Sequence, residues 1–347
     1  MAPRRVASLA LDESARVAVT SRSFSRSAVL RSELLERYPR STFNEAGVRL
    51  SGERLRAHLL HHEAAIVGLE EISRSLIESL PELRVISKYG VGLDALDLGA
   101  MRDHGLLLGW TPGVNRRAVA ELTLALILGS LRQVVRAHRQ VVAGTWDSRS
   151  GATLTGKTVG IVGLGHVGRE LVSLLVPFRC RVLANDLLEF PEFCERHGVE
   201  MVPLEELLAL SDVVSLHVPI TERTRGFIDS KQIGRMRPGA VLVNTARGEV
   251  VDEDALSRAL ESGALSGAAF DVLSEEPPRR SRLLGCENVI ITPHIGGSAP
   301  EAILEMGRAA IAQLDRARPV GPDLFPDGLP PTSRPGVRTP DPECSPL

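Results

Sequence analysis

Three polar side chains in the second half of the chain could form an acid–base site. They are Arg247, Glu276 and His294, and each comes shortly after an apolar run that predicts a buried strand. The planar guanidinium of an arginine binds carboxylates, and a histidine paired with a carboxylate exchanges a proton near neutral pH. Held together, the three groups would bind a carboxylate and move a proton beside it. Apart, they are an ion-pair partner and two solvated side chains.

Glu275 and Glu276 are adjacent, so on an extended backbone their side chains point in opposite directions and at most one faces the site. Glu276 is our candidate partner for His294, because a carboxylate would raise the pKa of the imidazole above about 6.5 and hold one tautomer. Hydride transfer on a 2-hydroxy acid needs an anchor for the carboxylate, a base for the hydroxyl proton and a group that orients the base. We expect Arg247 to be the anchor and His294 the base.

A glycine-rich loop earlier in the chain has the spacing of a dinucleotide-binding turn. Gly163, Gly165 and Gly168 follow a predicted strand at 158–162 and open a predicted helix at 169–176. The first glycine permits the tight turn, the second lets a pyrophosphate approach, and the third lets the helix pack on the strand. The N-terminus of the helix then favours the phosphates through its free N–H groups and its dipole.

Asp186 ends the next predicted strand, 18 residues after Gly168. A carboxylate at this place hydrogen-bonds the ribose 2′-hydroxyl of NAD and repels the 2′-phosphate of NADP. No arginine follows at 187 or 188, so we expect NAD as the cofactor. Without a ligand, the same features would be a glycine turn and a carboxylate that caps the next helix. His166, inside the loop, either contacts a phosphate or is a solvated side chain.

Length and composition exclude several classes of protein. The chain has 347 residues, 43% hydrophobic and 24% charged, which predicts two globular domains of about 150 residues each. The net charge of −2 argues against nucleic-acid binding by bulk charge. No apolar run approaches the roughly 20 residues of a membrane span. The four cysteines lack ligand or CxxC spacing, so we expect no metal, reduced thiols and a cytoplasmic location.

Short apolar runs alternate with helical patterns in both halves of the chain, which predicts an α/β protein with crossover connections and parallel sheets. A long apolar helix is predicted at 117–136, after a Pro-Gly turn. It is too apolar for an open surface, so we expect it between the domains or against a second subunit. The proline-rich segment 319–347 shows no periodicity, and we expect a disordered or extended tail.

These motifs resemble those of the D-isomer-specific 2-hydroxyacid dehydrogenases, most of all the phosphoglycerate dehydrogenase-like branch. The resemblance covers about residues 60–312, and the motifs occur in the family's order. They are Lys88–Asp94, Thr111–Asn115, Ala120–Glu121, Gly163–Gly168, Asn244–Gly248, Asp271–Pro277 and Pro293–Gly297. The family's catalytic arginine, glutamate and histidine match Arg247, Glu276 and His294, the glutamate being the one directly before the proline.

The resemblance implies two Rossmann-like domains with parallel sheets, the cofactor domain being inserted into a flavodoxin-like substrate domain. The substrate domain would comprise 1–112 and 296–318, and the NAD-binding domain 113–295. It further implies a small 2-hydroxy or 2-keto acid as substrate, and a homodimer formed through the cofactor domains with helix 117–136. Besides the three glycines, it carries into the cofactor site His166, Val167, Asp186, His217, Val218, Pro219, Thr245, Ala246, Asp271, Gly296 and Gly297.

The resemblance places the substrate on the segment Lys88, Gly90, Val91 and Gly92, where exposed backbone N–H groups can form a nest for a carboxylate. Lys88 stands where the family often has arginine, so it supplies a cation to the substrate or is a solvated strand-end charge. The acidic segment 68–71 stands where phosphoglycerate dehydrogenases carry Ser, Arg and Thr, which disfavours a phosphorylated substrate.

We therefore expect an NAD-dependent D-2-hydroxyacid dehydrogenase. Two alternatives stay open at this point. One is a 3-phosphoglycerate dehydrogenase proper. The other is an NAD(H)-sensing binding protein like the corepressors that share this fold and keep the three catalytic residues.

Overall fold

The computed structural model describes residues 11–148 and 151–321, which divide into two compact units. Unit 1 comprises the chain up to Trp110 and again from Ala310, and unit 2 is Thr111–Ala309. The predicted boundaries of 112/113 and 295/296 therefore differ from the observed division. The larger difference is at the second boundary. The chain returns to unit 1 at Ala310, within the helix α13 (Pro300–Leu314), and the predicted boundary at 295/296 lies before this helix.

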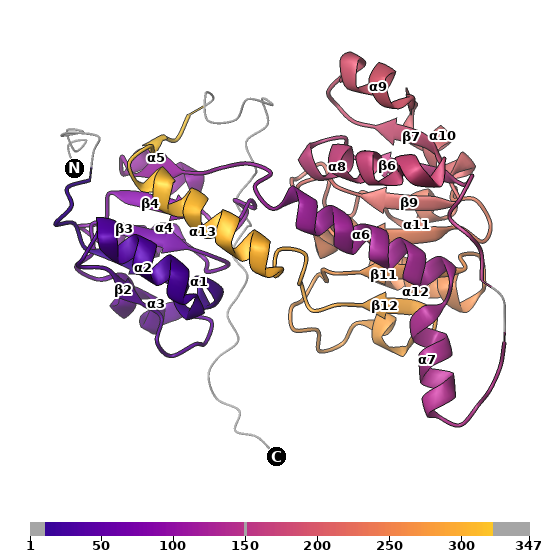
Figure 1. Ribbon diagram of the computed structural model, residues 1–347, viewed down its shortest axis with the longest axis horizontal. Coiled ribbons are helices and arrows are strands. Elements are labelled where there is room, and N and C mark those ends of the chain that lie inside the picture. Colours follow the sequence, from indigo (N-terminus) through magenta and orange to yellow (C-terminus); the bar gives the residue numbers. More distant parts are fainter. Residues whose placement is uncertain (1–10, 149–150, 322–347) are drawn as a thin grey trace. The chain divides into compact units, whose positions relative to one another are not determined.

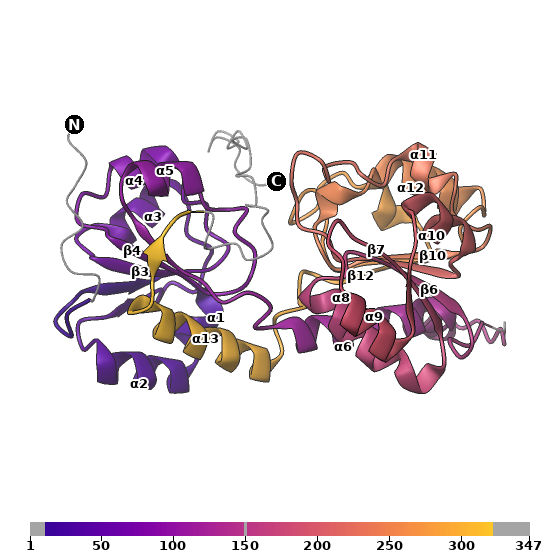
Figure 2. The same ribbon diagram turned by 90° about the horizontal axis from the view of Figure 1, so that it is seen from above.

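Unit 1 is built on a six-stranded sheet in the order β13-β5-β4-β3-β1-β2. Its strands are β1 (Val17–Val19), β2 (Thr42–Phe43), β3 (Ala64–Val67), β4 (Val85–Lys88), β5 (Leu107–Gly109) and β13 (Arg318–Pro319). Its helices are α1 (Arg22–Arg26), α2 (Ala28–Arg37), α3 (Gly52–Leu59), α4 (Arg74–Glu78) and α5 (Leu98–Asp103). Figure 2 shows α1, α2 and α13 on one face of this sheet and α3, α4 and α5 on the other.

The sheet of unit 1 is parallel, as predicted, except for β13, which pairs antiparallel with β5. The chain also stays ordered beyond the predicted start of the tail, since Pro319 pairs with Leu107 and Val320 is buried. An edge strand accepts a proline because the missing N–H need not face a neighbouring strand. The rest of the predicted tail, 322–347, lies outside the described residues.

Unit 2 is built on a seven-stranded parallel sheet in the order β12-β11-β10-β9-β6-β7-β8 (Figure 1). The strands are β6 (Thr158–Val162), β7 (Arg181–Asn185), β8 (Val199–Met201), β9 (Val213–Leu216), β10 (Val241–Asn244), β11 (Gly267–Phe270) and β12 (Val289–Ile291). Central strands such as β9, β10 and β11 are buried along their whole length, as expected for a sheet covered on both faces. β6 has the bounds of the strand predicted at 158–162.

Helices cover both faces of the unit 2 sheet, with α6, α8 and α9 on one side and α10, α11 and α12 on the other (Figure 2). Their bounds are α6 (Arg116–Leu131), α7 (Val134–Val142), α8 (His166–Leu175), α9 (Pro191–His197), α10 (Leu204–Leu210), α11 (Ser230–Ile233) and α12 (Glu253–Glu261). Three short 3-10 turns complete the unit: η1 (Val176–Phe178), η2 (Gly248–Val250) and η3 (Arg282–Gly285).

The predicted single helix at 117–136 is two helices in the structure. It breaks at Gln133, whose φ of 51° is left-handed, and α7 leaves α6 at an angle of 60°. The apolar periodicity continues through this break, so the pattern alone did not reveal it. Within the described ranges no single helix is long and apolar enough to cross a membrane, and only α6 and α7 counted together across their bend pass that test.

Candidate functional site

The ends of three neighbouring strands bring the predicted acid–base residues to one edge of the unit 2 sheet. Asn244, Phe270 and Ile291, at the ends of β10, β11 and β12, are aligned by the strand register. Arg247 and His294 each come three residues after one of these ends. Parallel sheets bind their ligands at the carboxyl ends of the strands. The topology therefore places both residues where a ligand is expected.

His294 and Glu276 form the predicted pair. The His294 Nδ1 and Glu276 Oε2 atoms lie 2.8 Å apart, and both side chains are about one-third exposed. Burial acts to raise the pKa of Glu276, but the hydrogen bonds from His294 and the Leu273 N–H and the Arg247 charge together lower it below its ordinary value. Since Nδ1 faces Glu276, Nε2 is the nitrogen that can exchange a proton with a substrate.

A buried carboxylate fixes the turn that carries His294. Asp271 accepts hydrogen bonds from Thr292 Oγ1 at 2.5 Å and from the N–H groups of Ile295 and Gly296 at 2.8 Å each. Its backbone carbonyl accepts the His294 N–H at 2.8 Å, and His294 itself has a φ of 55°. Such a conformation is strained in a non-glycine residue and persists where the surroundings hold it. The direct role in the cofactor site predicted for Asp271 and Gly296 stays a prediction, and their observed bonds orient His294.

Arg247 is placed by the side chain of Asn244. The Asn244 amide donates to the Arg247 carbonyl at 2.8 Å, and its oxygen accepts the Ala246 N–H at 3.0 Å. Gly248 follows, and a Cβ at this position would lie 2.0 Å from the Leu273 carbonyl carbon. The loop that carries Arg247 therefore touches the backbone that leads to Glu276.

The glycine loop has the geometry predicted for a pyrophosphate site. Gly163 has a φ of 97°, and a Cβ on Gly168 would lie 2.2 Å from the Gly163 carbonyl oxygen. A Cβ on Gly165 would meet nothing within 4 Å, so the backbone there faces open space. Helix α8 begins directly after Gly165, and the first N–H groups of a helix lack helical acceptors. These features fit the phosphates of NAD.

Asp186 and His166 flank this loop. The Asp186 carboxylate accepts the Leu164 N–H at 2.5 Å and the Leu188 N–H at 2.9 Å, so it lies directly beside the glycine turn. His166 is the first residue of α8, and a Cβ added to Gly113 would lie 2.4 Å from its Cγ. The imidazole thus packs on the segment that enters unit 2, and it is not the fully solvated side chain that we considered.

The remaining predicted cofactor residues lie at the same edge of the sheet. His217 Nε2 is 2.9 Å from Ser215 Oγ, and burial lowers the pKa of His217 to about 3. Thr245 Oγ1 is 2.9 Å from Thr123 Oγ1 of α6. Contacts of His217 and Thr245 with the cofactor stay a prediction. The same holds for contacts of the cofactor with Val167, Val218, Pro219, Ala246 and Gly297.

The predicted substrate loop lies in unit 1, directly after β4. Within the described ranges the N–H groups of Gly90, Val91 and Gly92 donate no hydrogen bond, while Trp110 Nε1 donates to the Val91 carbonyl at 3.0 Å. Free N–H groups on a short loop suit a carboxylate. Lys88 is 4% exposed and donates through Nζ to the Gly68 carbonyl, so it is not a solvated strand-end charge.

Next to Lys88 lies the acidic segment. Glu70 is also 4% exposed, and its Oε2 atom accepts the Gly68 N–H at 2.8 Å and Thr20 Oγ1 at 2.6 Å. The peptide groups of Gly68 are therefore held by Glu70 on one side and by Lys88 on the other. Among the described residues, no cluster of three or more His, Cys, Asp or Glu side chains could hold a metal ion.

Two contacts beside the site were not predicted from the sequence. Arg169, directly after the third glycine, places its guanidinium over the ring of Phe190 at 4.4 Å. Its position directly after the third glycine was the available sequence signal. Gly248 was named only as part of a motif, because a contact between two loops leaves no mark in the local sequence.

The fold and the glycine loop define a dinucleotide-binding α/β protein with an acid–base pair at the carboxyl edge of its larger sheet. Residues 124–296 match the profile of the D-isomer specific 2-hydroxyacid dehydrogenase, NAD binding domain. The chain belongs to the D-isomer-specific 2-hydroxyacid dehydrogenase family, and NAD is its cofactor.

Named relatives agree with this family. The glyoxylate reductase of Korarchaeum cryptofilum is 38% identical over 72% of this chain and 78% of its own length. Human D-3-phosphoglycerate dehydrogenase is 36% identical over 82% of this chain and 55% of its own length. This chain thus spans about half the length of the D-3-phosphoglycerate dehydrogenases that it matches. The structure of D-lactate dehydrogenase from Aquifex aeolicus, with NAD and lactic acid, superposes with a TM-score of 0.74 at 27% identity, over 86% of this chain and 93% of that one.

Proposed function

We propose that this protein is an NAD-dependent oxidoreductase that interconverts a D-2-hydroxy acid and the corresponding 2-keto acid. The observation that carries the proposal is the contact of 2.8 Å between His294 Nδ1 and Glu276 Oε2 at the carboxyl edge of the NAD-binding sheet. In this geometry the Glu276 carboxylate holds one tautomer of His294, and the imidazole can then donate or accept a proton. The names of the relatives, which include a glyoxylate reductase and a D-lactate dehydrogenase, support the same class of reaction.

The residues divide the chemistry between them. Bound NADH supplies the hydride for reduction of the keto group. His294 gives a proton through Nε2 to the carbonyl oxygen in reduction, and takes it back from the hydroxyl in oxidation. Glu276 stabilises the imidazolium by its negative charge. Arg247 binds the substrate carboxylate and polarises the carbonyl oxygen. The role of Gly90, Val91 and Gly92 in substrate binding stays a prediction.

A 3-phosphoglycerate dehydrogenase is the second candidate, because relatives of that name are 36% identical over 82% of this chain. The buried Glu70 argues for an unphosphorylated acid, since a carboxylate repels a phosphate. The decisive assay is NADH oxidation with glyoxylate, hydroxypyruvate, 2-oxoglutarate and 3-phosphohydroxypyruvate, with NADPH as the cofactor control.

His294→Ala is the variant that tests the role of the histidine. We expect kcat to fall by about 10²- to 10⁴-fold with the preferred acid, which is the usual contribution of a general acid. NADH binding, followed by nucleotide fluorescence, is expected to persist. Tight NADH binding without turnover of any acid in the wild-type protein would instead favour an NAD(H)-sensing binding protein.

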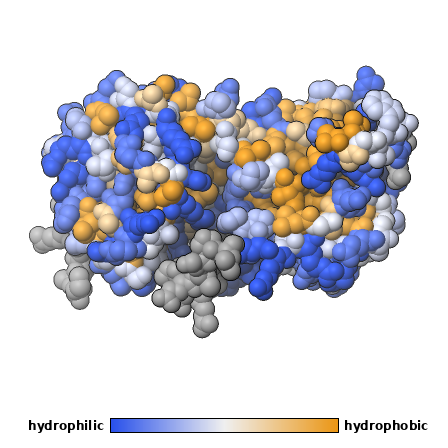
Figure 3. All heavy atoms as spheres, turned by 90° about the horizontal axis from the view of Figure 1, so that it is seen from below, coloured by the Kyte–Doolittle hydropathy of each residue, from blue (hydrophilic) through white to orange (hydrophobic). Residues whose placement is uncertain are grey.

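We also propose a homodimer formed through α6 and α7. None of the α7 side chains is buried, and Val134, Val142 and the following Trp146 are 56%, 74% and 88% exposed. A mainly apolar groove lies between α6, α7 and β12, and Arg132 is its one charged residue. Its lining is Ala125, Leu126, Leu128, Gly129, Arg132, Val134, Val135 and Ile290. Figure 3, seen from below, shows apolar surface gathered on the unit at the right. An amphipathic helix with exposed valines beside an apolar groove can be self-complementary, as a two-fold dimer interface must be.

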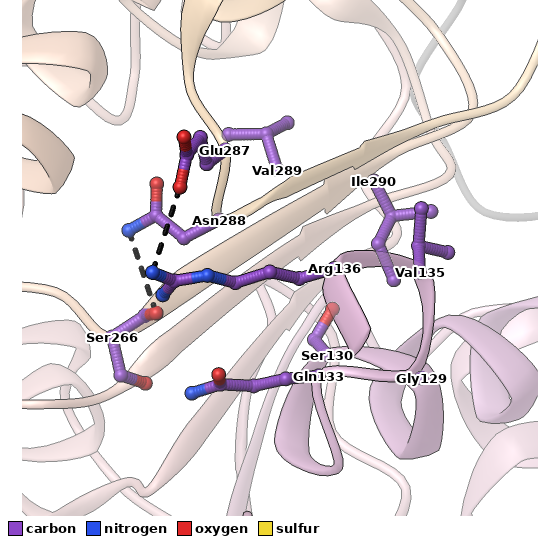
Figure 4. Close-up of a pocket in the computed structure, with 10 residues that line it drawn as sticks. All are labelled: Gly129, Ser130, Gln133, Val135, Arg136, Ser266, Glu287, Asn288, Val289 and Ile290. Carbon is purple, nitrogen blue, oxygen red and sulfur yellow. Dashed lines mark hydrogen bonds and ion pairs between the residues drawn. The ribbon is translucent and has the colours of Figure 1, made fainter. Parts of the chain in front are cut away.

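A small pocket at the foot of α7 adds to this proposal. Figure 4 shows Arg136 reaching across it to Glu287, at 3.5 Å, while Val135 and Ile290 lie at its apolar end. Arg136 Nε and Ser130 Oγ are buried and have no hydrogen-bond partner in the described part of the chain. Buried polar atoms are normally paired, so a second subunit is expected to supply partners here.

The test of the dimer is the mass in solution, measured by light scattering during size exclusion. Val134→Asp combined with Val142→Asp is expected to give the monomer. Leu210→Asp is the matched control, because Leu210 is 39% exposed at the end of α10, on the opposite face of the sheet from α6 (Figure 2). A monomeric wild-type protein would contradict the proposal. We further propose a cytoplasmic location, which suits the free Cys180, Cys194 and Cys286.

A further inference from the structure

Arg169, beside the glycine loop, forms no ion pair with a carboxylate in the described part of the chain. Arg169 lies in the first turn of α8, directly after Gly168 of the glycine loop. Among the described residues it forms no ion pair, although neighbouring arginines such as Arg116 and Arg117 both bind Glu170. Its guanidinium lies 4.4 Å from the centre of the Phe190 ring, a cation–π contact. The side chain of an exposed arginine is normally mobile, whereas this contact restrains the guanidinium of Arg169.

The position of this stack matters because of Asp186. Phe190 is four residues after Asp186, in the segment between β7 and α9. Asp186 contacts the glycine loop through the Leu164 N–H. The guanidinium therefore lies against the segment that follows Asp186, at the corner where β7 ends. In a dinucleotide fold this corner receives the adenosine ribose.

We propose that Arg169 is a latent ligand for the 2′-phosphate of NADP, and that the charge of Asp186 is what prevents its use. The inference rests on the cofactor site of the proposed function and is independent of the substrate. An arginine near the ribose 2′ position accommodates a 2′-phosphate, whereas an acid there selects the 2′-hydroxyl. This chain carries both groups, and Phe190 keeps the guanidinium at the corner. The preference for NAD thus depends on one carboxylate.

Removal of the charge of Asp186 tests the proposal. Asp186→Asn is expected to tighten NADPH binding by about 10- to 100-fold, the range of one charge-assisted hydrogen bond. Asp186→Ser serves as a second neutral variant, since asparagine cannot accept both backbone N–H groups as aspartate does. Dissociation constants for NADH, NADPH and adenosine 2′,5′-bisphosphate, measured by calorimetry, give a readout that needs no turnover.

A second substitution separates the effect of Arg169 from the effect of the charge of Asp186. Arg169→Gln added to Asp186→Asn is expected to abolish the gain in NADPH affinity. Arg179→Gln is the matched control, because this exposed arginine follows α8 at its other end and carries the same charge. Phe190→Leu keeps the bulk but removes the aromatic face, and it is expected to weaken NADPH binding of Asp186→Asn by about two- to fivefold.

Three results would overturn the proposal. The first is an Asp186→Asn protein that binds NADH but gains nothing for NADPH. The second is a gain that survives Arg169→Gln, and the third is an equal loss in the Arg179→Gln control. A wild-type protein that binds neither dinucleotide would instead refute the proposed function. The two failures are therefore distinguishable.

Discussion

Substitution of Gly248 by alanine is expected to damage both the stability and the activity of this protein. A Cβ at this position would lie 2.0 Å from the Leu273 carbonyl carbon, 2.2 Å from the Ser274 nitrogen and 2.4 Å from the Leu273 oxygen. Carbon atoms in contact are normally about 3.5–4.0 Å apart, so the two loops must separate by about 1.5 Å. All three neighbours are backbone atoms, and no side-chain rotation can relieve the clash.

The backbone on the far side of this contact is itself tied. The Ser274 N–H donates to Glu253 of α12 at 2.7 Å, and the Leu273 N–H donates to Glu276 at 3.1 Å. Movement of this segment therefore disturbs Glu276, the partner of His294. Overpacking of this kind costs about 1–3 kcal/mol of unfolding free energy. A displacement of about 1 Å at a reacting group can lower kcat/KM by about 10²-fold.

The assay combines urea unfolding with steady-state kinetics on the preferred keto acid. Gly285→Ala is the control, because a Cβ on Gly285 would meet nothing within 4 Å. We expect Gly285→Ala to behave as the wild-type protein and Gly248→Ala to lose both stability and kcat/KM. If Gly248→Ala matched Gly285→Ala in both measurements, the Arg247 loop and the Glu276 loop would not be coupled as we describe.

Two further predictions concern the cofactor edge of the sheet. Because burial lowers the pKa of His217 from 6.5 to about 3, unfolding takes up a proton there, and this group destabilises the fold as the pH falls from 6.5 towards 3. In His217→Gln that contribution is lost, so the difference in urea midpoint from the wild type should change across this window, and a constant difference would contradict the assignment. Asp271→Asn puts an amide group against N–H donors and should lower kcat/KM by about 10- to 100-fold. Asp229→Asn, at another carboxylate that accepts backbone N–H groups, should leave kcat/KM unchanged, and equal losses in the two variants would refute the positioning role of Asp271.

Residues close together in the chain were predictable from the sequence. The glycines at 163, 165 and 168 and the carboxylate at 186 follow strands that are buried apolar runs, and the structure has each of these strands. The pairing of His294 with Glu276, and not with Glu275, also followed from sequence, through the family motif that ends in proline. In these cases the deciding interactions are local, or the order of parallel strands brings their ends together.

Other features depend on contacts that only the folded chain makes. The break at Gln133 divides a continuous apolar pattern, and Pro319 joins a sheet through a strand more than 200 residues away. Lys88 is buried and donates to the Gly68 carbonyl, whereas its type and position suggested a solvated or substrate-binding charge. The contact of Gly248 with Leu273 and the stack of Arg169 on Phe190 likewise join segments that are distant in sequence. Local patterns specify which elements form, whereas the packing of distant elements decides which side chains are buried, held or left without a partner.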